Sequence, residues 1–171
     1  MVTESSTLYK LIILYMLRKT SFPLTNAQLS EFILEQGYTT YFHLQEALSE
    51  MLEANLLHVE TIRNTSYYRM TEEGENTITY FGNQISHAIR EDIDIFLKEN
   101  SYRLRNEVSV IADYHKLTGQ DYIVSCQVKE RDEFLIDLKL AVPTEEAAKS
   151  ICNNWSKKNQ DVYSYLMKEL L

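Results

Sequence analysis

Two short helical patterns separated by a tight turn, within residues 25–54, constrain the fold of this chain more than any other feature. Thr25 and Gln28 have the spacing of a capping box, in which side-chain oxygens satisfy amide hydrogens at a helix start. Gly37 is expected to end this helix as a left-handed C-cap, shortly before a second helix over residues 40–54. The apolar face of the second helix consists of Leu44, Ala47, Leu48, Met51 and Leu52. This combination is typical of a helix-turn-helix.

The segments on either side of this helix pair extend the pattern. Residues 8–17 form an apolar helix before it, and residues 56–62 and 66–70 are expected to form two strands around a turn at 64–65. Thr71 caps a following helix whose first turn is acidic. Three helices, a hairpin and a helix, within about seventy-five residues, is the order of a winged helix-turn-helix domain.

The helix over residues 8–17 is apolar around its whole circumference. Leu11, Ile12 and Tyr15 share one stripe, whereas Ile13 lies on another side. A helix of this kind is buried on more than one face. We therefore expect it to pack on something besides its own three-helix core, such as a second subunit.

The helix that starts at Thr71 meets Gly82, and we expect it to break there and restart at Ser86. Glycine costs about 1 kcal/mol in a helix interior, and serine is a favourable cap. An apolar stripe then continues to about Lys98. One continuous helix is the alternative.

In the last third of the chain, apolar residues alternate with polar ones, which is the period of a strand. Residues 108–114, 122–128 and 134–140 follow this alternation, and their connections are short enough for hairpins. They predict a three-stranded antiparallel meander with one buried face. A helix starts at residues 143–144, and Asn159 is expected to cap a final one.

The predicted fold class is therefore α+β, an N-terminal winged helix-turn-helix followed by a three-stranded antiparallel meander with C-terminal helices. We expect a winged helix-turn-helix domain over residues 1–81 and a linker helix over residues 82–100. Residues 101–171 form the remaining α+β region, for dimerisation or effector binding.

Composition limits the functional class and the location of the protein. The net charge is −8, and residues 1–80 carry five Lys and Arg against ten Asp and Glu, whereas a DNA-binding surface normally concentrates basic residues. The longest apolar run, residues 11–17, is far shorter than the roughly 18 residues that span a bilayer. The N-terminal residues lack the pattern of a secretory signal, and the two isolated cysteines fit a reducing cytoplasm. We therefore expect a cytoplasmic protein without membrane association.

The sequence lacks the patterns of an enzyme or cofactor site. Its histidines are scattered, without an HExxH or CxxC spacing, and its glycines form no phosphate-binding loop. Cys152 shares an apolar stripe with Trp155, so we interpret it as a core residue rather than a nucleophile. We expect no catalytic residue, no bound metal and no cofactor.

One long stretch carries a resemblance to a known family. Residues 9–57, YKLIILYMLRKTSFPLTNAQLSEFILEQGYTTYFHLQEALSEMLEANLL, resemble the start of a bacterial family known only as domain of unknown function 4364. The most specific piece is FPLTNAQLSEFILEQGYTTYF, and the similarity continues through TEEG at residues 71–74 over nearly the whole chain. The resemblance implies a winged-helix N-terminal domain, like those of bacterial transcription regulators, and a family-specific C-terminal region. It implies no established activity, catalytic residue or ligand.

The function expected from this fold is non-enzymatic, DNA-binding transcriptional regulation, with double-stranded DNA as partner. The helix over residues 40–54 would enter the major groove, and the hairpin would contact the flanking backbone. His43 and Gln45 are expected to approach base edges, Gln45 pairing with adenine, and Ser49 shares their outward arc. Phosphate contacts are expected from Thr25, Asn26, Thr39, Thr40 and Tyr41. Hairpin contacts are expected from Arg63, Asn64 and Arg69.

An acidic helix surface favours a second hypothesis. Glu46, Glu50 and Glu53 lie on the outward arc of the same helix, where they would repel phosphates. The alternative function is therefore a winged-helix protein–protein interaction module, an acidic adaptor that does not bind DNA.

The C-terminal region has three possible uses, which are dimerisation, binding of an unknown small effector and docking of another protein. We favour a homodimer, because winged-helix readers usually bind two-fold sites. Apolar residues of the first helix and of the final helices (Tyr163, Leu166 and Leu170) are candidates for its interface. Alternatively, these faces pack the two halves of one chain together.

Overall fold

The computed structural model describes residues 2–171, with side chains from Ser6 onward. It is a mixed α+β structure with two small antiparallel sheets. The chain divides into two compact units, residues 1–104 and residues 105–171, which are described separately. In the described part of the chain, no helix combines the length and the apolar character that a membrane crossing requires.

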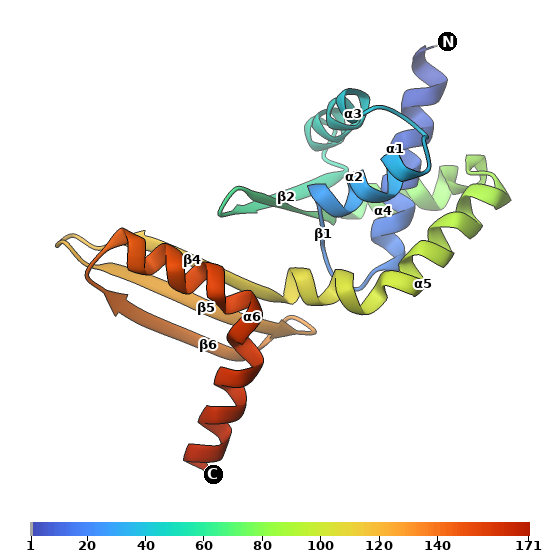
Figure 1. Cartoon of the computed structure of the whole chain (residues 1–171). Helices are drawn as coiled ribbons and strands as arrows, with labels where there is room; N and C mark the ends of the chain where they lie inside the picture. Colours follow the sequence, from blue (N-terminus) through green and yellow to red (C-terminus); the bar gives the residue numbers. More distant parts are fainter. Residues whose placement is uncertain (1) are drawn as a thin grey trace. The chain divides into compact units, whose positions relative to one another are not determined.

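The first unit consists of helices around a small sheet (Figure 1). Its elements are α1 (Val2–Lys19), β1 (Leu24–Thr25), α2 (Asn26–Glu35), α3 (Tyr41–Glu53), β2 (Leu57–Ile62), β3 (Thr65–Met70), α4 (Glu72–Phe81), the 3₁₀ turn η1 (Gly82–Gln84) and most of α5 (His87–Ser109). The strand order is β1-β3-β2, and all pairs are antiparallel. The elements therefore follow the predicted order of three helices, hairpin and helix.

The stretch of α1 from Leu11 to Leu17 is buried on every side by its own unit. All residues from Leu11 to Leu17 are at most 6% exposed, and they share one core with Ile93, Leu97 and Leu104 of α5. The prediction that α1 packs on more than a three-helix core is confirmed. The surface that covers it belongs to the same chain, so this stretch of α1 offers no apolar surface to a second subunit.

Local signals set the helix boundaries of the first unit. Thr25 and Gln28 form the predicted capping box, and Thr71 caps α4 by accepting a hydrogen bond from the Gly74 amide. Gly37 follows α2 with φ +67°, a left-handed conformation that favours glycine.

The β2–β3 turn differs by one residue from the expected Asn64–Thr65. Arg63 and Asn64 both have positive φ, as a two-residue turn with the twist of a hairpin requires, and Ile62 pairs with Thr65.

The break between α4 and α5 lies where it was predicted. Helix α4 ends at Phe81, the η1 turn follows, and the Ser86 side chain accepts a hydrogen bond from the Ile89 amide at the start of α5. Helix α5 then continues to Ser109, well beyond the predicted end near Lys98, and it packs within the first unit as far as Leu104. It continues because Leu97, Leu104 and Val108 recur at helical spacing and are buried. Val108, which was expected in a strand, therefore belongs to the helix.

The second unit is a three-stranded sheet covered by one helix. Its elements are β4 (Val110–Lys116), β5 (Tyr122–Glu130), β6 (Glu133–Val142) and α6 (Glu145–Leu170). The order β4-β5-β6, antiparallel throughout, confirms the predicted meander. The core lies between α6 and one sheet face, and its buried members are Val124, Cys126, Ala148, Cys152 and Trp155.

Helix α6 is a single helix, so the prediction of two C-terminal helices was wrong. Asn159 does not cap a new helix, because its buried side chain donates to the carbonyl oxygens of Trp155 and Ser156 (both 3.0 Å) inside α6. A side chain that competes for these carbonyls bends a helix without ending it. Figure 1 shows α6 lying along the sheet with its first turns and then changing direction, so that its last turns extend beyond the strands.

Candidate nucleic-acid interface

Helix α3 has one buried face and one open face. Leu44, Ala47, Leu48 and Met51 are buried in the core of the first unit. The opposite arc begins at Phe42, which is 72% exposed, and continues through Glu46, Ser49 and Glu53, which are all exposed. The open arc is therefore available to a partner along the whole helix.

The first turn of α3 is held by its cap. The Thr40 hydroxyl accepts a hydrogen bond from the His43 amide (3.4 Å) and lies 3.2 Å from His43 Nδ1. Both residues are exposed, as is the neighbouring Tyr41. Three of the residues predicted to contact DNA thus lie together at the N-terminal end of α3.

Asn26 and Gln45 form a reciprocal amide pair between α2 and α3. Asn26 Nδ2 donates to Gln45 Oε1 (2.8 Å), and Gln45 Nε2 donates to Asn26 Oδ1 (3.0 Å). Both side chains are half-buried. The pair fixes the orientation of both amide groups at the junction of the two helices, and the NH₂ group of Gln45 has a second hydrogen to donate.

Two residues that the sequence reasoning missed support this pair. Ser30 donates to Asn26 Oδ1 (3.2 Å), and the Tyr68 hydroxyl lies within 3.5 Å of Asn26 Nδ2. Ser30 follows Asn26 by one helical turn, a spacing that could have identified it from the sequence. Tyr68 comes from β3, and no local pattern connects it to α2.

Thr25 lies at the buried start of α2. Its hydroxyl accepts from the Gln28 amide (3.1 Å) and its own amide donates to Gln28 Oε1 (3.0 Å). Gln28 is only 2% exposed, and its Nε2 atom also donates to the Leu104 carbonyl oxygen (3.1 Å). Thr25 is itself buried and both its hydroxyl and its amide are occupied in the cap, so it does not lie where the predicted phosphate contact requires it.

The turn between α2 and α3 is anchored to α5. Tyr38 donates to Asp92 Oδ2 (2.9 Å), and burial, followed by this hydrogen bond, raises the pKa of Tyr38 to about 12. The hydroxyl of the next residue, Thr39, is buried and has no hydrogen-bond partner among the described residues. Thr39 thus points inward, away from the position that a phosphate contact requires.

The hairpin carries the remaining predicted residues. Arg63 and Asn64 form its exposed tip, and Arg69 lies exposed on β3, opposite His58. The hairpin thus contributes two basic side chains, one at the turn and one on a strand.

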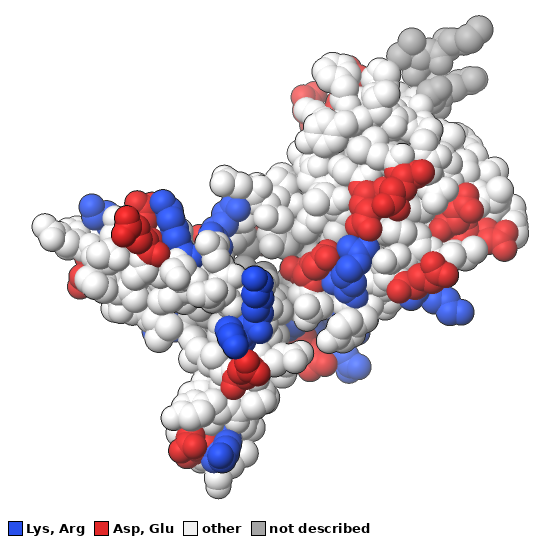
Figure 2. Space-filling view, in the orientation of Figure 1, with Lys and Arg blue, Asp and Glu red and all other residues white. Residues whose placement is uncertain are grey.

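Charge is unevenly distributed over these elements. Helix α3 contains three glutamates and no Lys or Arg. Glu50 forms an ion pair with Lys10 of α1, whereas Glu46 and Glu53 lie exposed on the open arc. On the face drawn in Figure 2, acidic side chains are spread over the first unit, with fewer basic ones between them. The least acidic part of the candidate interface is therefore the first turn of α3 together with the hairpin tip.

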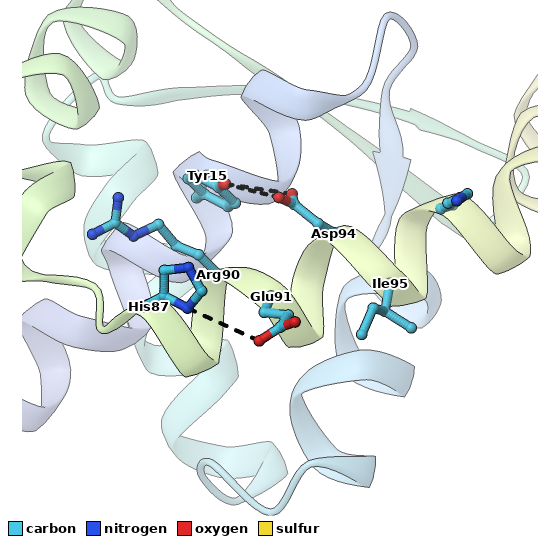
Figure 3. Close-up of a pocket in the computed structure, with 7 residues that line it drawn as sticks. Tyr15, His87, Arg90, Glu91, Asp94 and Ile95 are labelled. Atoms are coloured by element: carbon cyan, nitrogen blue, oxygen red, sulfur yellow. Dashed lines mark hydrogen bonds and ion pairs between the residues drawn. The ribbon is translucent and has the colours of Figure 1, made fainter.

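A separate hollow of about 440 Å³ lies between α1 and the outer face of α5 (Figure 3). The Tyr15 hydroxyl lies 3.3 Å from Asp94 Oδ1, Lys19 forms an ion pair with the same carboxylate (3.2 Å), and His87 lies 3.9 Å from Glu91. The hydrogen bond to Tyr15, and less strongly that to Asp94, raises the pKa of Lys19. The contacts of Tyr15 and Lys19 with Asp94 connect α1 with α5, whereas His87 and Glu91 both belong to α5.

Among the described residues, no group of three or more His, Cys, Asp and Glu side chains could hold a metal ion. Cys126 is buried in the second unit, and desolvation raises the pKa of its thiol to about 11. Cys152 lies in the same core. This environment keeps Cys126 in the thiol form and lowers its nucleophilicity.

Comparison with known proteins gives one match. Neither a curated protein nor a solved structure matches the chain. The family model described as a domain of unknown function, DUF4364, matches residues 9–170, which includes both units and nearly the whole chain. The resemblance seen in the sequence is confirmed, and the chain belongs to the DUF4364 family.

Proposed function

We propose that this protein is a non-enzymatic, DNA-binding transcriptional regulator that acts as a homodimer in the cytoplasm. Its first unit is a winged helix-turn-helix in which α2 and α3 form the two-helix motif and β2–β3 the wing. Helix α3 enters the major groove, and the wing contacts the flanking backbone.

The observation that carries the proposal is the Asn26–Gln45 pair. Gln45 lies in the second turn of α3, half-buried beside α2 at the edge of the open arc. Its amide is held in one orientation by two hydrogen bonds, so little side-chain entropy is lost when it binds a base. Because the edge of the amide that carries both a donor and an acceptor is paired with Asn26, Gln45 keeps one amide hydrogen, which can donate to a purine N7 in the major groove.

The neighbouring residues also fit a helix α3 that lies in the major groove. Thr40, Tyr41 and His43 are at the N-terminal end of α3, where the helix dipole favours a phosphate. Arg63 and Arg69 place positive charge on the wing. The two exposed carboxylates, Glu46 and Glu53, weaken general attraction to DNA, and we expect them to make binding depend on base contacts rather than on charge alone.

An acidic adaptor is the second candidate, because aromatic residues are exposed beside these carboxylates. Tyr41 is 58% and Phe42 is 72% exposed at the start of α3. Exposed aromatic side chains are typical anchors of protein interfaces. In that function the open arc of α3 would bind a protein, and no duplex sequence would be preferred.

Selection from random duplexes, followed by affinity measurements with variants, tests the proposal. Gln45→Ala should lower affinity for the selected sequence by about 1–3 kcal/mol and relax preference at one base pair. The matched control is Gln36→Ala, at the exposed C-cap of α2, which should change nothing. If Gln45→Ala retains both affinity and preference, the assignment of α3 to the groove is wrong.

Charge removal separates the two candidates. Glu46→Gln and Glu53→Gln should each raise duplex affinity by up to about fivefold, since like charges at about 4 Å in water repel by roughly 1 kcal/mol. Under the adaptor hypothesis the same variants leave duplex binding absent, whereas Phe42→Ala abolishes binding of the protein partner. Failure to select any duplex sequence would overturn the proposal in favour of the adaptor.

A further inference from the structure

Strand β6 is an unpaired edge of the sheet in the second unit. It hydrogen-bonds to β5 on one side only, and among the described residues no strand pairs with its other side. It is ten residues long and contains no proline. An edge of this kind presents a row of backbone donors and acceptors that another strand can extend.

The apolar face of β6 is only partly covered. Ile136 and Leu138 are half-buried and Leu140 is 43% exposed on the face that carries α6, because α6 packs mainly over β4 and β5. Asp137 and Lys139 project from the other face, where Asp137 Oδ1 accepts a hydrogen bond from Gln127 Nε2 (3.2 Å). The regular part of β6, residues 136–140, therefore has apolar side chains on one face and two opposite charges on the other.

We infer that β6 pairs with β6 of a second copy of this chain, antiparallel and centred on Leu138, to join two sheets into one of six strands. In this register Leu138 lies opposite its own copy and Ile136 lies opposite Leu140 of the other chain. Asp137 then faces Lys139 of the other chain on the opposite face, and the two-fold axis generates this ion pair twice.

The charges select this register over its neighbours. A shift by one residue would place apolar side chains opposite charged ones on both faces. Centring on Asp137 or on Lys139 would keep the faces matched but would place two carboxylates or two ammonium groups opposite each other. Of these registers, only the one centred on Leu138 satisfies both the apolar face and the charges.

The two-fold arrangement also accounts for the uncovered apolar surface. It brings the α6 helices of both copies to the same face, on either side of a continuous apolar row from the two β6 strands. The second half of α6, beyond Asn159, has its own exposed apolar side chains, including Leu170 (78%) and Tyr165 (63%). These side chains have the chemistry needed to cover that row. The inference names the surface of the proposed homodimer and does not depend on DNA binding.

Swapping the charges of Asp137 and Lys139, first singly and then together, tests the interface. Sedimentation equilibrium of the full chain measures the mass in solution. The wild type should have twice the 20.1 kDa of one chain. Asp137→Lys or Lys139→Asp alone should raise the dimer dissociation constant by roughly ten- to a hundredfold, because each turns two attractive contacts into repulsive ones. The double variant Asp137→Lys/Lys139→Asp restores the ion pairs in reversed order and should restore the dimer.

The matched control for Asp137→Lys is Asp121→Lys, which makes the same change of net charge in an exposed loop of the same unit and should leave the dimer intact. Circular dichroism and the rescue by the double variant separate loss of pairing from loss of folding. A monomer for the wild type at all concentrations would overturn the inference while leaving the DNA-binding proposal to be judged by duplex selection. A dimer that both single swaps leave unchanged would also overturn the inference, as would a double variant that stays monomeric.

Discussion

Replacing Gln28 with leucine should destabilise the first unit much more than a polar-to-apolar change usually does. Gln28 is 2% exposed, and its side chain accepts from the Thr25 amide and donates to the Leu104 carbonyl oxygen. It therefore completes the cap of α2 and also connects the start of α2 to α5. Leucine has a similar volume and can make neither hydrogen bond.

The size of this loss of stability follows from the two backbone groups that leucine would leave without a hydrogen-bond partner. Thr25 is itself only 7% exposed, so its amide would lose an acceptor in a buried position, at a cost of about 1–3 kcal/mol. Loss of the bond to Leu104 adds about 0.5–1.5 kcal/mol. Burial of the added apolar surface offsets part of this, and the free energy of unfolding should fall by about 2–3 kcal/mol.

Urea unfolding followed by circular dichroism measures this change. The midpoint should fall at an unchanged slope if the native fold is retained. Gln36→Leu, at the exposed C-cap of the same helix, is the control and should stay within about 0.5 kcal/mol of wild type. A Gln28→Leu variant as stable as this control would refute the reasoning that the buried amide holds α2 in place.

Three further predictions concern buried groups. Thr39→Val should raise the free energy of unfolding by about 1 kcal/mol, because it removes a buried hydroxyl that has no partner among the described residues; a loss of stability in urea unfolding would contradict this. Gly74→Ala should lower the thermal midpoint strongly, since a Cβ there would lie 2.3 Å from the Leu56 carbonyl oxygen, whereas Gly119→Ala, with no atom within 4 Å, should not. Cys126 should react with iodoacetamide at pH 8 only after unfolding, and fast labelling of the native protein would contradict its burial. Since its pKa is raised from 9.0 to about 11 in the fold, the protein should lose stability as the pH rises through that range.

The sequence predicted those parts of the fold that local chemistry determines. The capping box of Thr25 and Gln28, the left-handed Gly37 and the break before Ser86 each depend on a few neighbouring residues. The meander was predictable because the period of two along a half-buried strand is a strong signal.

The parts that were missed depend on which residues become buried, which local sequence signals do not reveal. The length of α5 follows from burial of Leu104 and Val108, which no cap or breaker reveals. Asn159 resembles a helix cap in sequence, but in the structure it is buried beside Trp155 within a continuous α6. Part of the cover of α1 comes from α5, about eighty residues later, so the sequence left a second subunit as an equal explanation.

Of the residues predicted for the candidate interface, Thr40, His43 and the hairpin arginines lie on exposed surface, whereas Thr25 is buried. The pairing of Gln45 with Asn26 could not be predicted, because it depends on the angle between α2 and α3. The same holds for the burial of the Thr39 hydroxyl under the turn.

The central claim is that the first unit of this DUF4364 protein recognises a DNA sequence through α3. The most direct measurement is the ratio of wild-type affinities for a duplex selected from a random pool and for the same duplex with shuffled sequence, over a series of salt concentrations. We predict a ratio of at least about a thousandfold, with the logarithm of affinity falling linearly as the logarithm of salt concentration rises. Equal affinity for both duplexes, or no binding to either at low salt, would contradict the claim.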